Sequence, residues 1–198
     1  MNDEIARLSK AVMDAKAALR DAQAKAKPQP VDDWEFKATD GSPVRLSALF
    51  GDKDDLILVH NMGKGCVYCT HWADGFRGHA EAIADRAAFV LCSNDDPKTT
   101  ADFAASRGWN YTCVSGAGSD FARTMGYMDD KGNPHPGISA FRKNADGSIV
   151  RTGTTPIGPG DDFCPTWPMF DLLGGANGWE PKYDYAKSGR CGSGCGCH

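Results

Sequence analysis

The sequence predicts one α/β domain with a central mixed sheet, preceded by a long helix. Three observations carry this prediction. Short runs of apolar residues with strand character alternate with helical segments along most of the chain, as in a three-layer α/β domain. The composition is ordinary for a globular protein, with 41% hydrophobic and 24% charged residues, which excludes disorder throughout. The length of 198 residues suits one domain with short appendages.

The first predicted element is a helix over residues 3–27, which are rich in Ala and Lys. Its apolar residues recur at spacings of three and four and form one narrow stripe: Ile5, Leu8, Val12, Ala15, Leu19 and Ala22. This stripe either packs on its own domain or forms the seam of a homodimer. Pro28 and Pro30 end the helix and make a stiff link. We therefore divide the chain into an amphipathic helix (1–27), a domain (31–185) and a flexible Cys-rich tail (186–198).

The first half of the domain is predicted to hold three strands and the start of a long helix. The strands are expected at 34–36, 44–46 and 55–60, with a turn at 40–41 and a helical turn from Ser47 to Phe50. The strand at 55–60 is the clearest, because its continuous apolar centre suggests burial on both faces. A glycine-punctuated loop follows it, and a helix then runs from Cys66 to about Asp85.

The second half continues the alternation of strands and helices. We expect strands at 87–92 and 111–114, a helix at 98–107 that Gly108 stops, and a short helix that Ser119 caps. Residues 138–142 and 148–152 form a hairpin, and a helix runs from Pro165 to Leu173. Residues 174–198 are poor in core-forming side chains and are expected to be loop and exposed tail.

The motif that carries chemistry is Cys66-x-x-Cys69, at the start of a helix that follows the clearest strand. The first amides of a helix have no partners within the helix and carry the positive end of its dipole, so they stabilise a thiolate at Cys66. Cys69 lies one turn later on the same face, where it can attack a mixed disulfide formed on Cys66. Half of a zinc site, or two inert buried thiols, are the alternative interpretations.

Two further residues are predicted to assist this pair. His60 lies at the end of the preceding strand, where we expect it to face the sulfurs and exchange a proton with Cys69. With Met62 and the two cysteines it also offers a ligand set that suits Cu(I). Pro136 precedes the hairpin, and a cis-proline there would shape a substrate groove beside the sulfurs; a trans turn is the alternative.

The order of elements, the cysteine pair at a helix start and the proline before the hairpin resemble the thioredoxin fold. The string from Gly65 to Phe76, which contains C-x-x-C-x-x-W-A-D-G-F, resembles the thioredoxin-like family catalogued as domain of unknown function 899. The resemblance extends over roughly residues 1–175. It implies that Cys66 attacks, that Cys69 resolves and that Pro136 occupies the cis-proline position. The P-x-x-x-T-x-x-C signature of peroxiredoxins is absent before both cysteines.

The tail carries a second group of sulfur ligands. Its residues Cys191, Cys195, Cys197 and His198 suit tetrahedral Zn(II) or Cu(I). They can also serve as a mobile redox arm, or be incidental thiols. Cys92 and Cys113 interrupt predicted strands and are expected to be core thiols, whereas Cys164 receives no role.

Composition and charge exclude several classes of function. The net charge of −4 argues against nucleic acid as the main partner, and no phosphate-binding glycine motif is present. No apolar run approaches the roughly 20 residues of a membrane helix, and the N-terminus lacks the apolar core of a secretory signal. We therefore expect a cytoplasmic protein.

The preferred interpretation is a thiol–disulfide oxidoreductase that acts on a disulfide-containing protein or a small-molecule thiol. It needs no organic cofactor, because the two sulfurs hold both electrons. The alternative is a Cu(I)- or Zn(II)-binding protein that uses the tail, the His60–Met62–Cys66–Cys69 cluster, or both.

Overall fold

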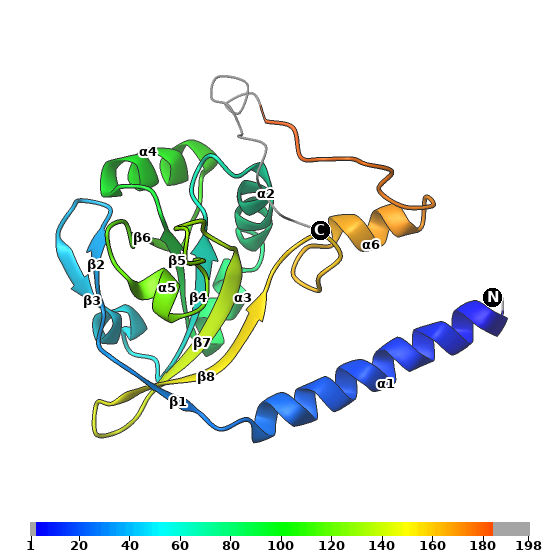
Figure 1. Cartoon of the computed structure of the whole chain (residues 1–198), viewed down its shortest axis with the longest axis horizontal. Helices are drawn as coiled ribbons and strands as arrows, with labels where there is room; N and C mark the ends of the chain where they lie inside the picture. The colour runs from blue at the N-terminus through cyan, green and yellow to red at the C-terminus, as the bar shows by residue number, and fades with distance from the viewer. Residues whose placement is uncertain (1–2, 184–198) are drawn as a thin grey trace.

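A mixed sheet forms the centre of the protein in the computed structural model, which describes residues 3–183 (Figure 1). Within those residues the sheet has eight strands in the order β1-β8-β7-β4-β5-β6-β2-β3. Strands β4, β5 and β6 run parallel, and all the other pairs are antiparallel. The strands are β1 (Gln29–Val31), β2 (Glu35–Ala38), β3 (Pro43–Arg45), β4 (Asp55–Asn61), β5 (Ala88–Ser93), β6 (Thr112–Ser115), β7 (Gly137–Lys143) and β8 (Ile149–Pro156).

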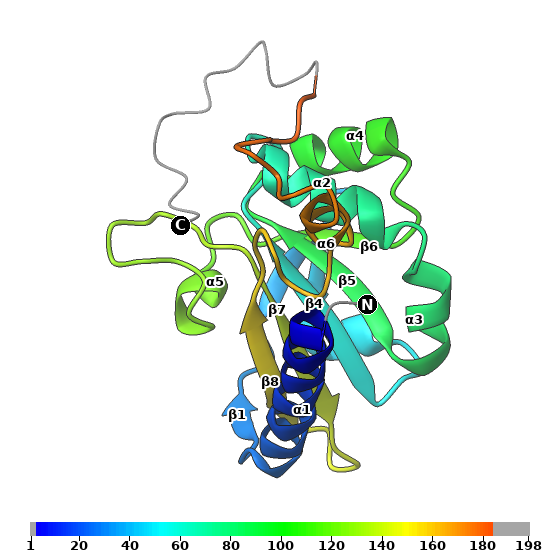
Figure 2. The same ribbon diagram turned by 90° about the vertical axis from the view of Figure 1, so that its right-hand side faces the viewer.

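Helices cover both faces of this sheet, which confirms the three-layer α/β prediction. Figure 2 shows α5 on one face and α2, α3 and α6 on the other. The helices are α1 (Asp3–Lys25), the 3-10 helix η1 (Leu46–Phe50), α2 (Val67–Phe76), α3 (Ala80–Arg86), α4 (Pro97–Arg107), α5 (Phe121–Thr124) and α6 (Thr166–Asp171).

The core lies in two clusters, one on each face of the sheet. Leu56 and Leu58 of β4 pack with Phe121 of α5, whereas Val59 packs with Trp72 of α2. Successive side chains of a strand point to opposite faces, so the even-numbered residues of β4 face α5 and the odd-numbered ones face α2. This alternation decides which residues of β4 can reach the cysteine pair.

The structure differs from the predicted elements in three places. Residues 29–31 form an edge strand paired with β8, a position that tolerates Pro30 because its missing N–H is not needed there. The helix expected to reach Asp85 ends at Phe76, and α3 begins at Ala80, because Gly75 and Gly78 weaken the intervening turn. The amide of Ser47 donates to the carboxylate of Asp33 (2.8 Å). Asp33, and not the side chain of Ser47, therefore accepts the hydrogen bond at the start of this helix.

Helix α1 buries none of its apolar stripe against the domain. None of the residues Asp3–Lys25 is buried, and Figure 1 shows the helix projecting from the base of the sheet. Lys16 Nζ lies 2.5 Å from Asp162 Oδ1, which ties the middle of the helix to the loop before α6. The interpretation that the apolar stripe packs on its own domain is therefore wrong. In the described part of the chain, no helix is long and apolar enough to cross a membrane.

Candidate functional site

Cys66 occupies the N-cap of α2, as the sequence predicts. Its backbone is extended (φ −95°, ψ 106°), and its Sγ accepts a hydrogen bond from the amide of Cys69 at 3.1 Å. The carbonyl of Cys66 accepts the first helical bond, from the amide of Thr70. The thiol therefore takes the place that a Ser or Asp side chain takes at an ordinary helix start, where unpaired amides need an acceptor.

Two side chains, one amide and one carboxylate, fix the loop before α2. Asn61 Oδ1 accepts from the amide of Gly63 (2.7 Å), and Asp95 Oδ2 accepts from the amide of Lys64 (2.6 Å). Gly63 has φ +106°, and a Cβ there would lie 2.7 Å from Asp95. Glycine is the residue that adopts this conformation readily and leaves room for Asp95. Gly63 is therefore needed for the loop that places Cys66 at the start of the helix.

Hydrogen bonding lowers the pKa of Cys66 below its ordinary value. The largest contribution is the bond from the Cys69 side chain, and the amides of Cys69 and Tyr68 add to it, while burial opposes it. Burial alone acts on Cys92 and Cys113 and raises the pKa of each to about 12. The thiolate, which is the nucleophilic form, is thus favoured at Cys66 and disfavoured at these two core thiols.

Both cysteines of the pair are more enclosed than the sequence predicts. Cys66 is 5% exposed and Cys69 is 3% exposed. A small, mainly apolar cavity reaches Cys69 and is lined by Met62, Tyr68, Cys69, Trp72, Pro136, Ile157, Gly158 and Pro159. Of the two cysteines, Cys69 lines this cavity and Cys66 does not.

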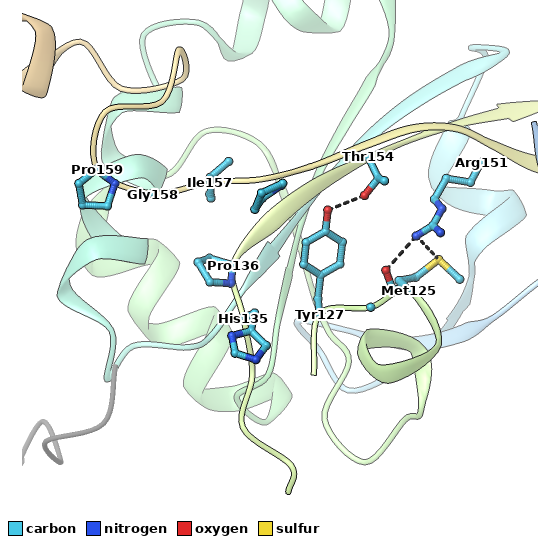
Figure 3. Close-up of a pocket in the computed structure, with 11 residues that line it drawn as sticks. Met125, Tyr127, His135, Pro136, Arg151, Thr154, Ile157, Gly158 and Pro159 are labelled. Atoms are coloured by element: carbon cyan, nitrogen blue, oxygen red, sulfur yellow. Dashed lines mark hydrogen bonds between the residues drawn. The ribbon is translucent and has the colours of Figure 1, made fainter. Parts of the chain in front are cut away.

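The small cavity adjoins a larger open cleft of about 700 Å³. Four residues line both spaces: Pro136, Ile157, Gly158 and Pro159. Figure 3 shows the cleft between the β7–β8 hairpin and the segment that carries Tyr127 and His135, with Arg151 and Met125 at its far end. The cleft is therefore a natural route for a substrate that extends away from the cysteine pair.

Pro136 lies where the sequence predicts, but its peptide bond is not cis. Residues 3–183 contain no cis peptide bond, so that expectation is wrong. The amide of His135, the residue before Pro136, donates to the carbonyl of Tyr127 (2.9 Å). Pro136 still presents a ring without an N–H donor to the cavity beside Cys69.

His60 does not assist the cysteines, because its side chain lies on the other face of the sheet. It is an even-numbered residue of β4, so it points with Leu56 and Leu58 toward α5. Its Nε2 lies 2.9 Å from Ser139 Oγ, and its ring stacks on Tyr127 at 4.0 Å. Burial, together with the charge of Arg151, lowers the pKa of His60 to about 3, so it is neutral at physiological pH.

The position of His60 also removes the predicted copper cluster at the main site. His60 and the cysteine pair lie on opposite faces of the sheet, so His60, Met62, Cys66 and Cys69 do not converge. No group of three or more His, Cys, Asp or Glu side chains between residues 3 and 183 is arranged to hold a metal ion. The other predicted metal ligands, Cys191, Cys195, Cys197 and His198, lie outside the described residues.

Tyr127 is a site residue that the sequence analysis missed. Its hydroxyl oxygen lies 3.0 Å from the carbonyl oxygens of both Ile138 and Thr155, which share its one proton, and its ring forms one wall of the cleft. A Cβ on Gly137 would lie 1.8 Å from this ring. The glycine directly after Pro136 was the available signal, since glycine within a strand marks a close approach.

Residues 174–183, which we call the C-terminal strap, form a loop, as the sequence predicts, and this loop contacts α2 and α6. Trp179 packs against Trp167 and Phe170. Tyr68 donates to Glu180 (3.1 Å), and Tyr183 donates to Asp74 (3.2 Å). The strap thus holds the outer side of the helix that carries the cysteine pair.

These features define the class of protein: a thioredoxin fold with a cysteine pair at the start of the helix after the central strand. The chain belongs to the family described as "Bacterial protein of unknown function (DUF899)", whose model matches residues 6–186. A search of curated protein sequences gives no significant match.

Three solved structures show the likeness in fold. Peroxidoxin BcpB from Mycobacterium tuberculosis is 27% identical, with a TM-score of 0.51 over 65% of this chain and 84% of that chain. A peroxiredoxin-like protein from Aquifex aeolicus is 11% identical, with a TM-score of 0.51 over 66% and 75%. Peroxiredoxin Q from Xanthomonas campestris is 18% identical, with a TM-score of 0.50 over 61% and 81%.

Proposed function

We propose that this protein is a thiol–disulfide oxidoreductase in which Cys66 is the attacking thiol and Cys69 the resolving thiol. The observation that carries the proposal is the position of Cys66 Sγ at the N-cap of α2, 3.1 Å from the amide of Cys69. The resemblance to the M. tuberculosis peroxidoxin supports thiol redox chemistry in general. The cytoplasmic location expected from the sequence is part of the proposal, because a reducing compartment keeps such a pair in its dithiol form.

The proposed reaction proceeds in two exchange steps. The Cys66 thiolate attacks one sulfur of the substrate disulfide, forms a mixed disulfide with it and releases the other sulfur as a thiolate. Cys69 then loses its proton and attacks Cys66, which closes the Cys66–Cys69 disulfide and releases the second substrate thiolate. Two electrons pass from the cysteine pair to the substrate, and an external dithiol returns them.

The surroundings of the pair favour a substrate with apolar groups beside its disulfide. The rim of the small cavity is formed by Tyr68, Pro136, Ile157 and Pro159, and none of these side chains is charged. The adjoining cleft has room for several residues of a peptide. We therefore favour a disulfide-containing protein over a small, highly charged thiol.

Hydroperoxide reduction is the reaction of the peroxiredoxins that share this fold. Their signature places a threonine hydroxyl near the nucleophilic cysteine, which disulfide exchange does not require. The position three residues before Cys66, where the peroxiredoxin signature has threonine, is Gly63. Gly63 offers no hydroxyl to a peroxide, so we expect disulfides to be reduced faster than hydroperoxides.

A trapping experiment tests the proposed roles. We expect the Cys69→Ser variant, mixed with a disulfide-bonded protein such as insulin, to accumulate a mixed disulfide on Cys66 because the resolving thiol is missing. Peptide mapping by mass spectrometry locates the adduct, and dithiothreitol should release it. The matched control is Cys66→Ser, in which Cys69 remains and no adduct should form at residue 69. Equal labelling of Cys66 and the buried Cys164 would show nonspecific reaction and contradict the assignment.

A further inference from the structure

Helix α1 carries an apolar stripe that the described part of its own chain leaves uncovered. Ile5, Leu8, Val12 and Leu19 are each about half exposed, at 54%, 49%, 53% and 57%. Isolated helices are only marginally stable in water, and most helical stability in proteins comes from packing of the apolar face. A helix of 23 residues with no buried residue therefore calls for a partner.

The stripe has the period of a coiled-coil seam. Written as heptads, Ile5, Val12 and Leu19 fall at a positions, and Leu8, Ala15 and Ala22 fall at d positions. We propose that α1 pairs with α1 of a second copy of this chain as an antiparallel coiled coil. In this pairing Ile5 faces Ala22 of the partner subunit, Leu8 faces Leu19 of the partner subunit, and Val12 faces Ala15 of the partner subunit.

The sizes of the side chains favour the antiparallel over the parallel orientation. An antiparallel pair places a large residue in every layer of the seam, and most layers match a large residue with a small one, which packs well. A parallel pair in register places Ala15 against Ala15 of the partner subunit, and Ala22 against Ala22 of the partner subunit. These two layers would bury little apolar surface.

The charges beside the seam favour the same orientation. Glu4 and Lys25 both occupy g positions, at opposite ends of the helix. Antiparallel pairing places Glu4 opposite Lys25 of the partner subunit, and symmetry repeats this ion pair at the other end. Charges at g positions select orientation in coiled coils, and a parallel pair would hold Glu4 and Lys25 about 30 Å apart.

The seam of this assembly contains no residue of the redox site. The domain follows the C-terminal end of α1 and contacts the middle of the helix through Lys16 and Asp162. An antiparallel pair therefore attaches the two domains at opposite ends of a coil about 35 Å long, with each domain lying along the coil toward its middle. The cleft lies at the open end of the β7–β8 hairpin, where Pro136 and Pro156 line it, and it extends to Arg151, which bonds to Gln29 of β1. The inference does not depend on the proposed function, because it rests on α1 alone.

Charge reversal tests both the dimer and its orientation. We expect the full chain to sediment as a dimer at micromolar to submillimolar concentrations in low salt. Glu4→Lys or Lys25→Glu should weaken the dimer about tenfold, because two attractive pairs become repulsive. The double variant with both changes should restore the dimer. The matched control, Asp3→Lys, makes the same charge change in the same turn but at an f position, and should have little effect.

Three results would overturn the inference. One is a wild-type chain that stays monomeric over this range, and another is a chain that stays dimeric after deletion of residues 1–27. The third is a dimer on which Glu4→Lys and Asp3→Lys have equal effects, since this would show that Glu4 does not face Lys25 of the partner subunit. Replacement of Leu8 and Leu19 by Asp should give a monomer whose near-UV circular dichroism is unchanged, because α1 contributes no residue to the core of the domain.

Discussion

Replacing Cys66 with serine is expected to lower the rate of disulfide reduction by about three orders of magnitude or more, the size of loss typical of a removed nucleophile. Serine retains the N-cap hydrogen bond to the amide of Cys69, so α2 should begin at the same residue. Serine is not ionised at neutral pH and is a poor nucleophile there. The loss should therefore be chemical, without a loss of stability.

The measurement is the rate of insulin reduction with dithiothreitol as electron donor, for wild type and variant at equal folded concentration. Cys113→Ser is the matched control, because it makes the same change at a buried thiol whose pKa is raised to about 12. It should retain most of the activity. A Cys66→Ser variant that works at the wild-type rate would remove Cys66 from the reaction.

The second large effect is a dependence of stability on pH that His60 controls. The folded protein keeps His60 neutral down to a pKa of about 3, whereas the unfolded chain protonates it near 6.5. Between these values the unfolded state binds one more proton than the folded state. The free energy of unfolding should therefore fall as the pH falls from 6.5, by about 1.4 kcal/mol per pH unit from this residue.

Urea unfolding across this pH range measures the effect, and His60→Gln isolates it. Glutamine does not titrate, and its amide can still bond to Ser139 Oγ. The free energy of unfolding of the variant should change less steeply with pH, by the contribution of one proton. Other titrating groups act equally in both proteins. Parallel curves would show that His60 titrates normally in the folded state and is not enclosed between Tyr127 and Phe121.

Local patterns in the sequence were enough to predict most of the fold. The apolar run at 55–60 predicts β4, Asp96 and Gly108 mark the ends of α4, and the cysteine spacing predicts the start of α2. Each of these signals acts over a few residues. The strand at 29–31 escaped prediction because it depends on pairing with β8, about 120 residues later.

The candidate site was predicted only in part, for the same physical reason. Cys66 and Cys69 are placed by the local chemistry of a helix start, which the sequence shows directly. The side of the sheet to which His60 points depends on strand alternation relative to α2, and the sequence distance to Cys66 does not reveal it. Tyr127 and the C-terminal strap act through contacts distant in sequence. Gly137 signals a close approach in the strand, but it does not identify Tyr127 as the residue that makes it.

The central claim is that the start of α2 stabilises the Cys66 thiolate, and the pH dependence of alkylation at Cys66 tests it most directly. The rate of reaction with iodoacetamide, followed on the Cys66 peptide by mass spectrometry in the Cys69→Ser variant, reports the pKa of the thiol. The serine hydroxyl replaces the Cys69 thiol as a donor to Cys66 Sγ, and the backbone amides remain. We predict a midpoint below that of an ordinary cysteine, about 8.5. A midpoint above that value, as expected for a thiol governed by burial alone, would contradict the account.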